Sequence, residues 1–224
     1  ENEIAQSCTA HKKIDDPKTF AKYWVHNGFV IVDGEKMSKS IGNIRLVHEL
    51  IKQYRGEVLR LALLSTHYRQ PLNWTISAIE QSHKTLNRLY RSLKELDGIN
   101  VEQEKVLKPS SKILEILCDD LNTPKILVEL NALADQAFKA KTDEKKEIKI
   151  ELLATGSLLG ILQKKPDVWL GYGQTQNINS QTIEKLINER KEARRDGDFN
   201  RADNIREKLK NMGIEIEDTK EKTI

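Results

Sequence analysis

The sequence of 224 residues predicts a mostly helical fold, with a short α/β segment at the start, a helical bundle in the middle and a small domain at the end. Three observations support this prediction. A β-branched apolar run near residue 30 is typical of a buried strand, apolar residues recur at helical spacing over most of the chain beyond residue 44, and a stretch rich in Gly, Gln and Asn after residue 170 separates the last helices.

The α/β segment covers residues 1–43 and begins with a helix. Residues 29–32 predict a strand, because a short run of apolar, mainly β-branched residues between a glycine and an Asp-Gly turn is typical of a buried strand. The polar residues 36–40 follow. They therefore lie on a strand-to-helix connection, where ligand-binding loops are common in α/β domains.

Three helices are expected next. Apolar spacing predicts helices over residues 46–54 and 59–64, and a long helix over residues 76–96. Residues 67–74 are interpreted as a connection, because Pro71 lacks a backbone donor and interrupts a helix.

Further helices follow a polar linker at residues 99–109. Ser110 or Ser111 is expected to cap the first of them, and Thr123, a hydroxyl residue directly before a proline, predicts the start of the second. A third helix is expected from about residue 143 to 162. Helices of this length with one apolar side predict a bundle.

The last block is small. Residues 171–180 predict a flexible joint, and apolar positions at 183–187 and 205–212 predict two helices, the second ended by Gly213. Residues 214–218 alternate between apolar and acidic and predict a short strand.

Charge gives a weak indication of a partner. The net charge is only +3, but residues 11–100 carry fifteen Lys and Arg against nine Asp and Glu, whereas residues 181–224 carry eleven of each. A basic middle segment is compatible with a phosphate backbone and equally with an ordinary solvated surface. No apolar run approaches the length of a membrane span, so we expect no membrane partner.

Cysteine and histidine usage argues against a disulfide framework and against a complete metal site. Cys8 and Cys118 lie far apart, and none of the five histidines forms a His-x-x-x-His pair. This usage favours a reducing compartment, and we expect a cytoplasmic protein.

Residues 36–40 carry the most chemical information. They read Lys-Met-Ser-Lys-Ser, so two ammonium groups lie close together on a polar loop that Gly42 follows. Attack on the α-phosphate of ATP releases pyrophosphate, and cations placed where that negative charge develops lower the barrier. Lys36 and Lys39 are therefore candidate catalytic residues, and Met37, Ser38 and Ser40 join them as candidate ATP-binding residues. A solvated loop between two elements is the alternative.

The same five residues form the second signature motif of class I aminoacyl-tRNA synthetases, and four blocks together resemble the cysteinyl-tRNA synthetases. The blocks are residues 1–7, 23–43, 67–73 and 119–124, with shorter matches at 201–203 and 212–214. The resemblance implies four regions: the end of a class I Rossmann-like α/β catalytic domain (1–43), a helical connective region that contacts the tRNA stem (44–98), a helical bundle of the DALR type (99–169) and an anticodon-recognition domain (170–224).

This family activates cysteine with ATP to cysteinyl-adenylate and transfers it to tRNA(Cys). The resemblance therefore implies tRNA(Cys), L-cysteine and ATP with Mg²⁺ as partners, and a monomer. In the family, Zn²⁺ binds the substrate thiolate, and zinc prefers this soft sulfur ligand to the hydroxyl of serine. Glu3 matches one zinc ligand. The other ligands and the His-Ile-Gly-His motif would precede Glu1, so we expect a longer protein, and we expect the 224 residues alone not to catalyse the reaction.

The resemblance also implies which residues read the anticodon. Arginine and aspartate can bond the edges of splayed bases, and an aromatic ring can stack on one. The candidates by motif position are Arg194, Phe199, Asp203, Arg206 and Asp218. Arg60 and Arg69 are weaker candidates for the inner side of the tRNA. A surface helix stabilised by ion pairs is the alternative at the carboxy-terminal positions.

Three other functions fit part of the pattern. A cysteine:sugar ligase built on the same scaffold should lack a developed anticodon domain, whereas residues 170–224 resemble one. A non-catalytic tRNA-binding module has no reason to keep the lysine motif. The methionine enzyme of the same class is disfavoured by the blocks at residues 1–7 and 67–73.

Overall fold

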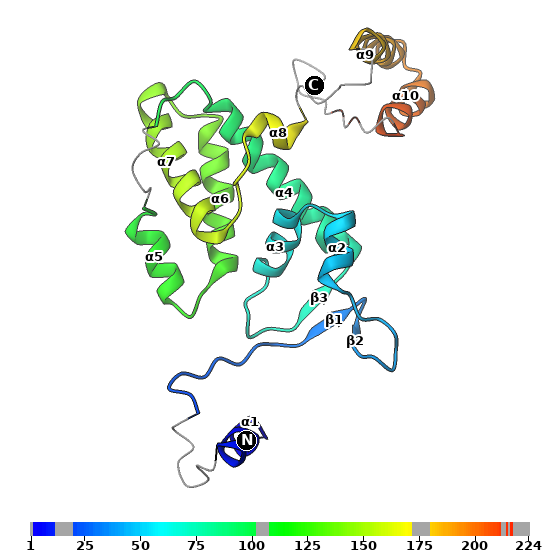
Figure 1. Cartoon of the computed structure of the whole chain (residues 1–224). Coiled ribbons are helices and arrows are strands. Elements are labelled where there is room, and N and C mark those ends of the chain that lie inside the picture. Colours follow the sequence, from blue (N-terminus) through cyan, green and yellow to red (C-terminus); the bar gives the residue numbers. More distant parts are fainter. Residues whose placement is uncertain are drawn as a thin grey trace. The chain divides into compact units, whose positions relative to one another are not determined.

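The computed structural model describes residues 2–11, 20–101, 108–171 and 180–211, together with Ile214 and Ile216. The described chain is mostly helical with one small sheet, which confirms the predicted fold class (Figure 1). It forms two compact units, Glu1–Pro166 and Asp167–Ile224. Most of the predicted linker at 99–109 and of the joint at 171–180 lies outside the described residues.

The first unit contains helix α1 (Asn2–Ala10) and a three-stranded sheet. Strand β1 (Val30–Val32) lies in the middle, antiparallel to β2 (Glu35–Lys36) and parallel to β3 (Leu72–Trp74). The interpretation of residues 67–74 as a connection throughout is therefore wrong. Pro71 directly precedes β3, where a proline costs no ladder hydrogen bond, so it does not prevent pairing.

Three helices lie at the predicted places, two of them between β2 and β3 in the sequence and one after β3. They are α2 (Val47–Gln53), α3 (Gly56–Leu64) and α4 (Ile76–Glu95). Helix α4 starts where the Thr75 hydroxyl accepts a hydrogen bond from the Ala78 amide at 3.0 Å. Its leucines at helical spacing, Leu86, Leu89 and Leu93, are buried, as their periodicity predicts.

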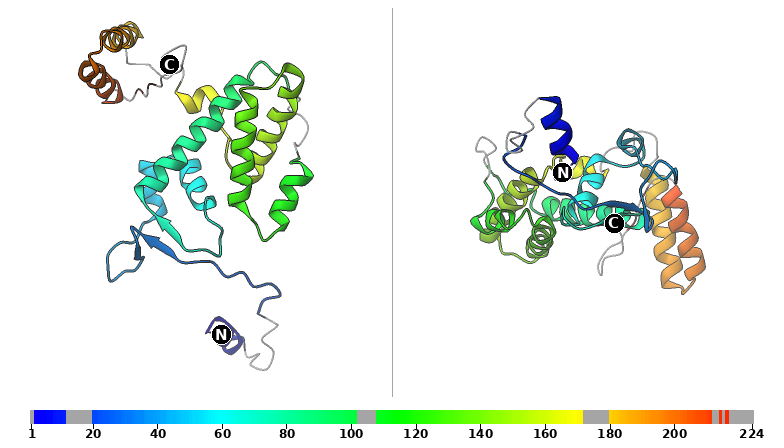
Figure 2. Two further views of the ribbon diagram at one scale, coloured as in Figure 1. Left: turned by 180° about the vertical axis from the view of Figure 1, so that it is seen from behind. Right: turned by 90° about the horizontal axis from the view of Figure 1, so that it is seen from below.

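The helical bundle adds α5 (Ser111–Cys118), α6 (Thr123–Ala137) and α7 (Thr142–Leu159). Helix α6 contacts α4, α5 and α7, and α4, α6 and α7 lie side by side in the views of Figures 1 and 2. Because Ile126, Leu130 and Ala134 on α6 are fully buried, this helix forms the centre of the bundle core.

Two helix boundaries differ from the prediction. Asn122, not Thr123, caps α6 by accepting from the Lys125 amide at 3.3 Å. The Thr123 hydroxyl instead donates to the Leu64 carbonyl at 2.9 Å. The hydroxyl that the sequence pattern predicts as the helix cap is therefore used in a contact with another helix. Helix α7 ends at Leu159 rather than at residue 162, because Gly160 adopts the left-handed conformation with φ 68°.

The carboxylate of Glu57 joins α3, α4 and the turn after α7. The Tyr90 hydroxyl donates to it at 2.8 Å, and the backbone amides of Leu162 and Gln163 donate at 2.8 and 3.2 Å. The Tyr90 hydroxyl in turn accepts from the Lys164 amide at 3.1 Å. Burial raises the pKa of Tyr90 above the ordinary tyrosine value, and the Glu57 carboxylate raises it further, so the phenol remains a donor.

We expect Glu57→Ala to lower the free energy of unfolding of the first unit by about 2–3 kcal/mol, because it removes the carboxylate to which the Tyr90 hydroxyl and two amides donate. Glu80→Ala, at an exposed position on α4, is the matched control and should change stability by less than about 0.5 kcal/mol. Urea unfolding followed by circular dichroism measures both. Equal effects of the two substitutions would show that the network adds no stability.

The second unit contains two long helices, α9 (Ser180–Arg195) and α10 (Phe199–Asn211), which pack against each other. Their core consists of Leu186, Ile205, Leu209 and Ile216. The short helix α8 (Pro166–Leu170) precedes them in the sequence. Both predicted helices are present, whereas the predicted helix end at Gly213 and most of the predicted strand at 214–218 lie outside the described residues.

Candidate functional site

The lysine motif begins on a strand and continues into an exposed loop. Lys36 is the last residue of β2, and Lys39 lies three residues later on the loop that leads towards α2. Both side chains are exposed, and the Lys36 ammonium lies 5.4 Å from the centre of the Phe29 ring. Two cations are therefore presented to solvent within four residues, and such a pair of charges attracts anions.

Asn43 closes this loop through its side-chain amide. Its Oδ1 accepts from the Ser38 backbone amide at 2.9 Å, and its Nδ2 donates to the Lys36 carbonyl at 3.3 Å. The Ser38 hydroxyl lies 3.1 Å from that of Ser40 and accepts from the Ile41 amide at 3.3 Å. Sequence reasoning did not identify Asn43 as a site residue, although asparagine commonly bonds nearby backbone in turns.

A tight turn before Lys36 is held by the neighbouring strand. Asp33 and Gly34 have φ values of 52° and 86°, which is the backbone that an Asp-Gly hairpin turn adopts. Asn73 on β3 accepts from the Gly34 amide at 3.1 Å through Oδ1. The start of the lysine loop is therefore held by two strands, through the pairing of β2 with β1 and through the bond from Gly34 to Asn73 on β3.

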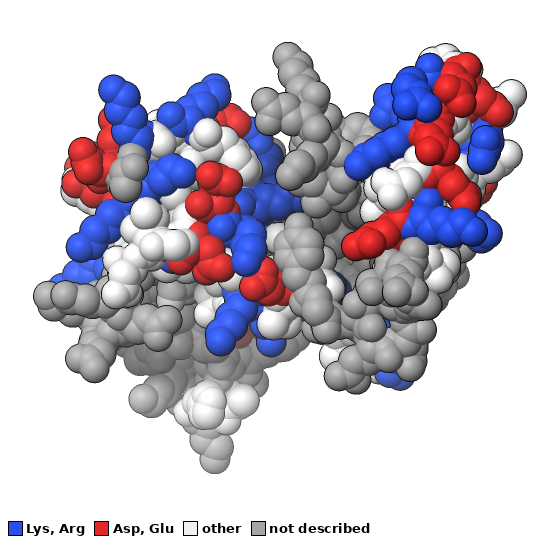
Figure 3. Space-filling model, turned by 90° about the horizontal axis from the view of Figure 1, so that it is seen from above, with Lys and Arg blue, Asp and Glu red and all other residues white. Residues whose placement is uncertain are grey.

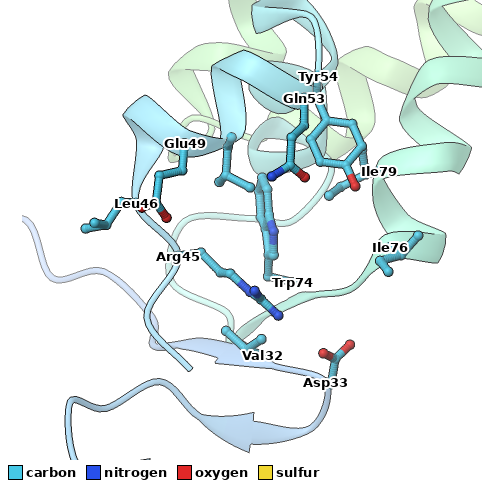
Figure 4. Close-up of a pocket in the computed structure, with 11 residues that line it drawn as sticks. Val32, Asp33, Arg45, Leu46, Glu49, Gln53, Tyr54, Trp74, Ile76 and Ile79 are labelled. Atoms are coloured by element: carbon cyan, nitrogen blue, oxygen red, sulfur yellow. The ribbon is translucent and has the colours of Figure 1, made fainter. Parts of the chain in front are cut away.

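A hollow of about 150 Å³ lies beside the base of the loop, between the sheet, α2 and the start of α4 (Figure 4). Its lining combines the aromatic rings of Tyr54 and Trp74 with the charged groups of Asp33, Arg45 and Glu49. Asp33 precedes the lysine motif in the chain and Arg45 follows it, so the hollow joins both flanks of the loop. No motif or periodicity in the sequence predicts this hollow.

Residues 67–69 and Asp120 form a polar clamp between two loops of the first unit. The Tyr68 hydroxyl donates to Asp120 Oδ1 at 2.5 Å, and Arg69 Nε lies 2.7 Å from Asp120 Oδ2. His67 Nε2 lies 2.8 Å from the Asp120 backbone carbonyl. These groups belong to two of the sequence blocks that carry the family resemblance, 67–73 and 119–124. The clamp therefore gives both blocks a structural role that the sequence did not reveal.

The clamp should depend on pH. The Tyr68 hydroxyl and the Arg69 guanidinium hold the pKa of Asp120 below its usual range. A carboxyl whose pKa is lower in the folded state adds stability above its unfolded pKa, and that stability disappears as the pH falls through the folded value.

We therefore expect Asp120→Asn to lower the midpoint of thermal unfolding at about pH 7, and the gap from wild type to narrow near pH 2, because the Asp120 carboxyl loses its charge as the pH falls through its lowered pKa. Thermal unfolding of both proteins at the two pH values measures this, and the acidic comparison is the internal control. A gap that persists undiminished in acid would contradict a role for the Asp120 charge.

Four of the five candidate anticodon residues are described, and all four are exposed. Phe199, Asp203 and Arg206 are spaced by four and three residues on α10, so they share one face of that helix, and Arg194 lies in the last turn of α9. The Phe199 side chain is 65% exposed. Asp218 lies outside the described residues.

The two weaker tRNA candidates have partners within the first unit. Arg69 is held by Asp120 and Tyr68. The Arg60 guanidinium lies against Gly160, where an added Cβ would approach it to 3.2 Å. Both side chains contribute to contacts between elements of the unit.

Glu3 lies in the first turn of α1 and is exposed. Among the described residues, no group of three or more His, Cys, Asp and Glu side chains is placed to hold a metal ion. Glu3 can thus supply one carboxylate ligand to a metal, and the described chain does not complete its coordination.

Surface charge is mixed in sign. On the face that Figure 3 shows, basic and acidic side chains alternate over the described residues instead of separating into regions of one sign. Within the described parts of the chain, no helix combines the length and the hydropathy needed to cross a membrane.

Comparison with known protein families gives two matches. Residues 1–84 match the catalytic domain of class I tRNA synthetases of the cysteine type, and residues 179–223 match the cysteinyl-tRNA ligase anticodon-binding domain. The first match contains the lysine loop and the sheet, and the second contains α9 and α10.

Comparison with individual proteins agrees. Proteins named cysteine–tRNA ligase are 46% identical over 222 residues in Rhodospirillum rubrum, 45% over 221 residues in Parvibaculum lavamentivorans and 40% over 225 residues in Ehrlichia canis. These alignments cover 97%, 97% and 100% of this chain and 47%, 46% and 47% of the relatives. The chain thus spans about half the length of the curated relatives it matches. The resemblance inferred from the motifs is confirmed, and the chain belongs to the cysteine–tRNA ligase family.

Proposed function

We propose that this chain acts in a cysteine–tRNA ligase, which activates cysteine with ATP and transfers it to tRNA(Cys). The observation that carries the proposal is the exposed lysine loop of residues 36–40, braced by Asn43 and by the sheet, in a chain that also has an anticodon-domain match. ATP would bind together with Mg²⁺. The ammonium groups of Lys36 and Lys39 would neutralise the negative charge that develops on the pyrophosphate as it leaves.

A zinc ion is part of the proposed reaction. Glu3, as an exposed carboxylate, fits one ligand of a zinc ion, and such an ion would select the thiol of cysteine over the hydroxyl of serine. The remaining ligands would come from outside these 224 residues. We further propose that the protein works as a cytoplasmic monomer, and that the four regions divide at residues 43, 98 and 169.

We also propose that the exposed face of α10 that carries Phe199, Asp203 and Arg206 binds tRNA. We propose that Phe199 stacks on a base, that Arg194, Asp203 and Arg206 bond base edges, and that Asp218 adds a further contact. The match of residues 179–223 to an anticodon-binding domain supports this assignment over a cysteine:sugar ligase. The lysine loop supports an enzyme over a non-catalytic tRNA-binding module.

Binding of the 224-residue chain to a tRNA(Cys) transcript tests the anticodon assignment. We expect Phe199→Ala to weaken binding roughly 10-fold, because a stacked base contributes about 1–3 kcal/mol. Val128→Ala, at another exposed apolar position on a helix, should leave binding unchanged. Filter binding measures both, with an anticodon-substituted tRNA(Cys) as second ligand. If wild type binds the two transcripts equally and Phe199→Ala has no effect, the assignment is wrong.

Activity is tested with a chimera in which residues 1–224 replace the matching part of the Rhodospirillum rubrum protein. We expect this chimera to catalyse cysteine-dependent exchange between ATP and pyrophosphate, and the 224-residue chain alone not to. Robust exchange by the chain alone would show that it needs no other part. Absence of exchange by a folded chimera, under conditions where the relative is active, would contradict the proposed function.

A further inference from the structure

We propose that Asn43 is a positioning residue for the phosphate chemistry, which fixes the spacing between the two lysines by bridging the loop that carries them. The proposal rests on the proposed function and deepens it. Asn43 does not belong to the lysine motif, and its side chain reaches back across the loop to bond both sides of Met37.

The bridge depends on the amide group. An asparagine side chain carries one acceptor, Oδ1, and one donor group, Nδ2, both attached to Cγ. Here the acceptor takes the Ser38 amide at 2.9 Å and the donor meets the Lys36 carbonyl at 3.3 Å. An aspartate could keep the first contact, but it would place a second oxygen against the carbonyl. Only asparagine and glutamine carry this amide, and the glutamine side chain is longer by one methylene.

One further hydrogen bond and a turn in the backbone close the loop around the bridge. The Gly42 amide donates to the Lys39 carbonyl at 3.2 Å, and Gly42 has φ 73°, a backbone that side-chain-bearing residues rarely adopt. The chain thus turns back directly after Lys39, which places the Asn43 side chain beside the Lys36 carbonyl. Lys36 is held on β2 by its pairing with β1. Because Asn43 bonds both Lys36 and Ser38, it fixes Ser38, and with it Lys39, relative to the sheet.

The consequence for chemistry is geometric. An exposed loop with two lysines samples many conformations unless local contacts restrict it. Electrostatic stabilisation of a leaving group requires that the charges be in place before the reaction. Removing the bridge should therefore lower the rate of the chemical step more than it weakens the binding of ATP.

Limited proteolysis tests the bridge itself. Trypsin cleaves after Lys36 and Lys39, and mass spectrometry follows the two cuts in the 224-residue chain. We expect Asn43→Ala and Asn43→Asp to accelerate these cuts roughly 5- to 10-fold, the change that loss of about 1 kcal/mol of loop closure gives. Asn100→Ala, at an exposed position outside the loop, is the control. Unchanged cleavage in both Asn43 variants would overturn the bridge.

Kinetics of the chimera tests its role in catalysis. We expect Asn43→Ala to lower kcat for cysteine-dependent ATP–pyrophosphate exchange by about 10- to 100-fold, with a much smaller change in KM for ATP. We expect Asn43→Asp to show no rescue, and Asn100→Ala to match wild type. A wild-type rate in Asn43→Ala, or a change confined to KM, would overturn the positioning role. Lack of exchange by the unsubstituted chimera would instead count against the proposed function, and the trypsin experiment would still decide the bridge.

Discussion

Replacing Lys36 and Lys39 together by alanine in the chimera should lower the rate of cysteine-dependent ATP–pyrophosphate exchange by at least about 10³-fold, and each single replacement by roughly 10²-fold. The physical reason is that both ammonium groups act where negative charge develops on the leaving pyrophosphate. Because the two lysines lie on one braced loop, the losses should not simply add.

Steady-state exchange with saturating cysteine measures this effect. Lys52→Ala is the matched control, since Lys52 is an exposed lysine in the last turn of α2 and lies outside the loop. It should leave the rate within about twofold of the unsubstituted chimera. If the double lysine variant forms adenylate at an unchanged rate, the loop has no part in the chemistry.

Substituting Gly28 by alanine should be the most destabilising single change in the sheet region. An added Cβ at Gly28 would lie 2.2 Å from the Gln70 carbonyl oxygen and 2.4 Å from its carbon, and neither backbone atom can move aside easily. The clash would separate the segment leading into β1 from the one leading into β3, where the Gly28 amide donates to the Tyr68 carbonyl at 2.7 Å. We expect a loss of about 3 kcal/mol in the free energy of unfolding of the first unit.

Gly98→Ala is the control for this substitution, because nothing lies within 4 Å of a Cβ built at Gly98. Its effect should remain within about 0.5 kcal/mol. Urea unfolding of wild type and both variants compares them directly. Comparable stability of Gly28→Ala and Gly98→Ala would show that the two strands can separate without cost.

The helices could be predicted from the sequence because their cores follow local periodicity. Helix α4 is the clearest case, since each buried leucine stands at the spacing that one helix face requires. Strand β3 could not be predicted in the same way. It contains only three residues, it follows a proline, and its partner β1 lies about forty residues earlier in the chain, so its pairing is set by tertiary contacts.

Local signals also failed where a tertiary contact competes with them. Thr123 has the side chain of a helix cap, but its hydroxyl bonds Leu64 in another helix, and Asn122 takes the cap instead. The site shows the same limit. The lysines could be found from their motif, whereas the Asn43 bridge and the clamp on Asp120 depend on how the backbone turns.

Charging of tRNA(Cys) with labelled cysteine by the chimera tests directly whether these residues supply the phosphate-binding loop and the anticodon-reading surface of a cysteine–tRNA ligase. We expect cysteine bound to tRNA(Cys) through an alkali-labile ester, and little charging of a transcript with a substituted anticodon. Cysteine transferred to a sugar, or no charged tRNA where the Rhodospirillum rubrum protein charges it fully, would contradict the proposed function.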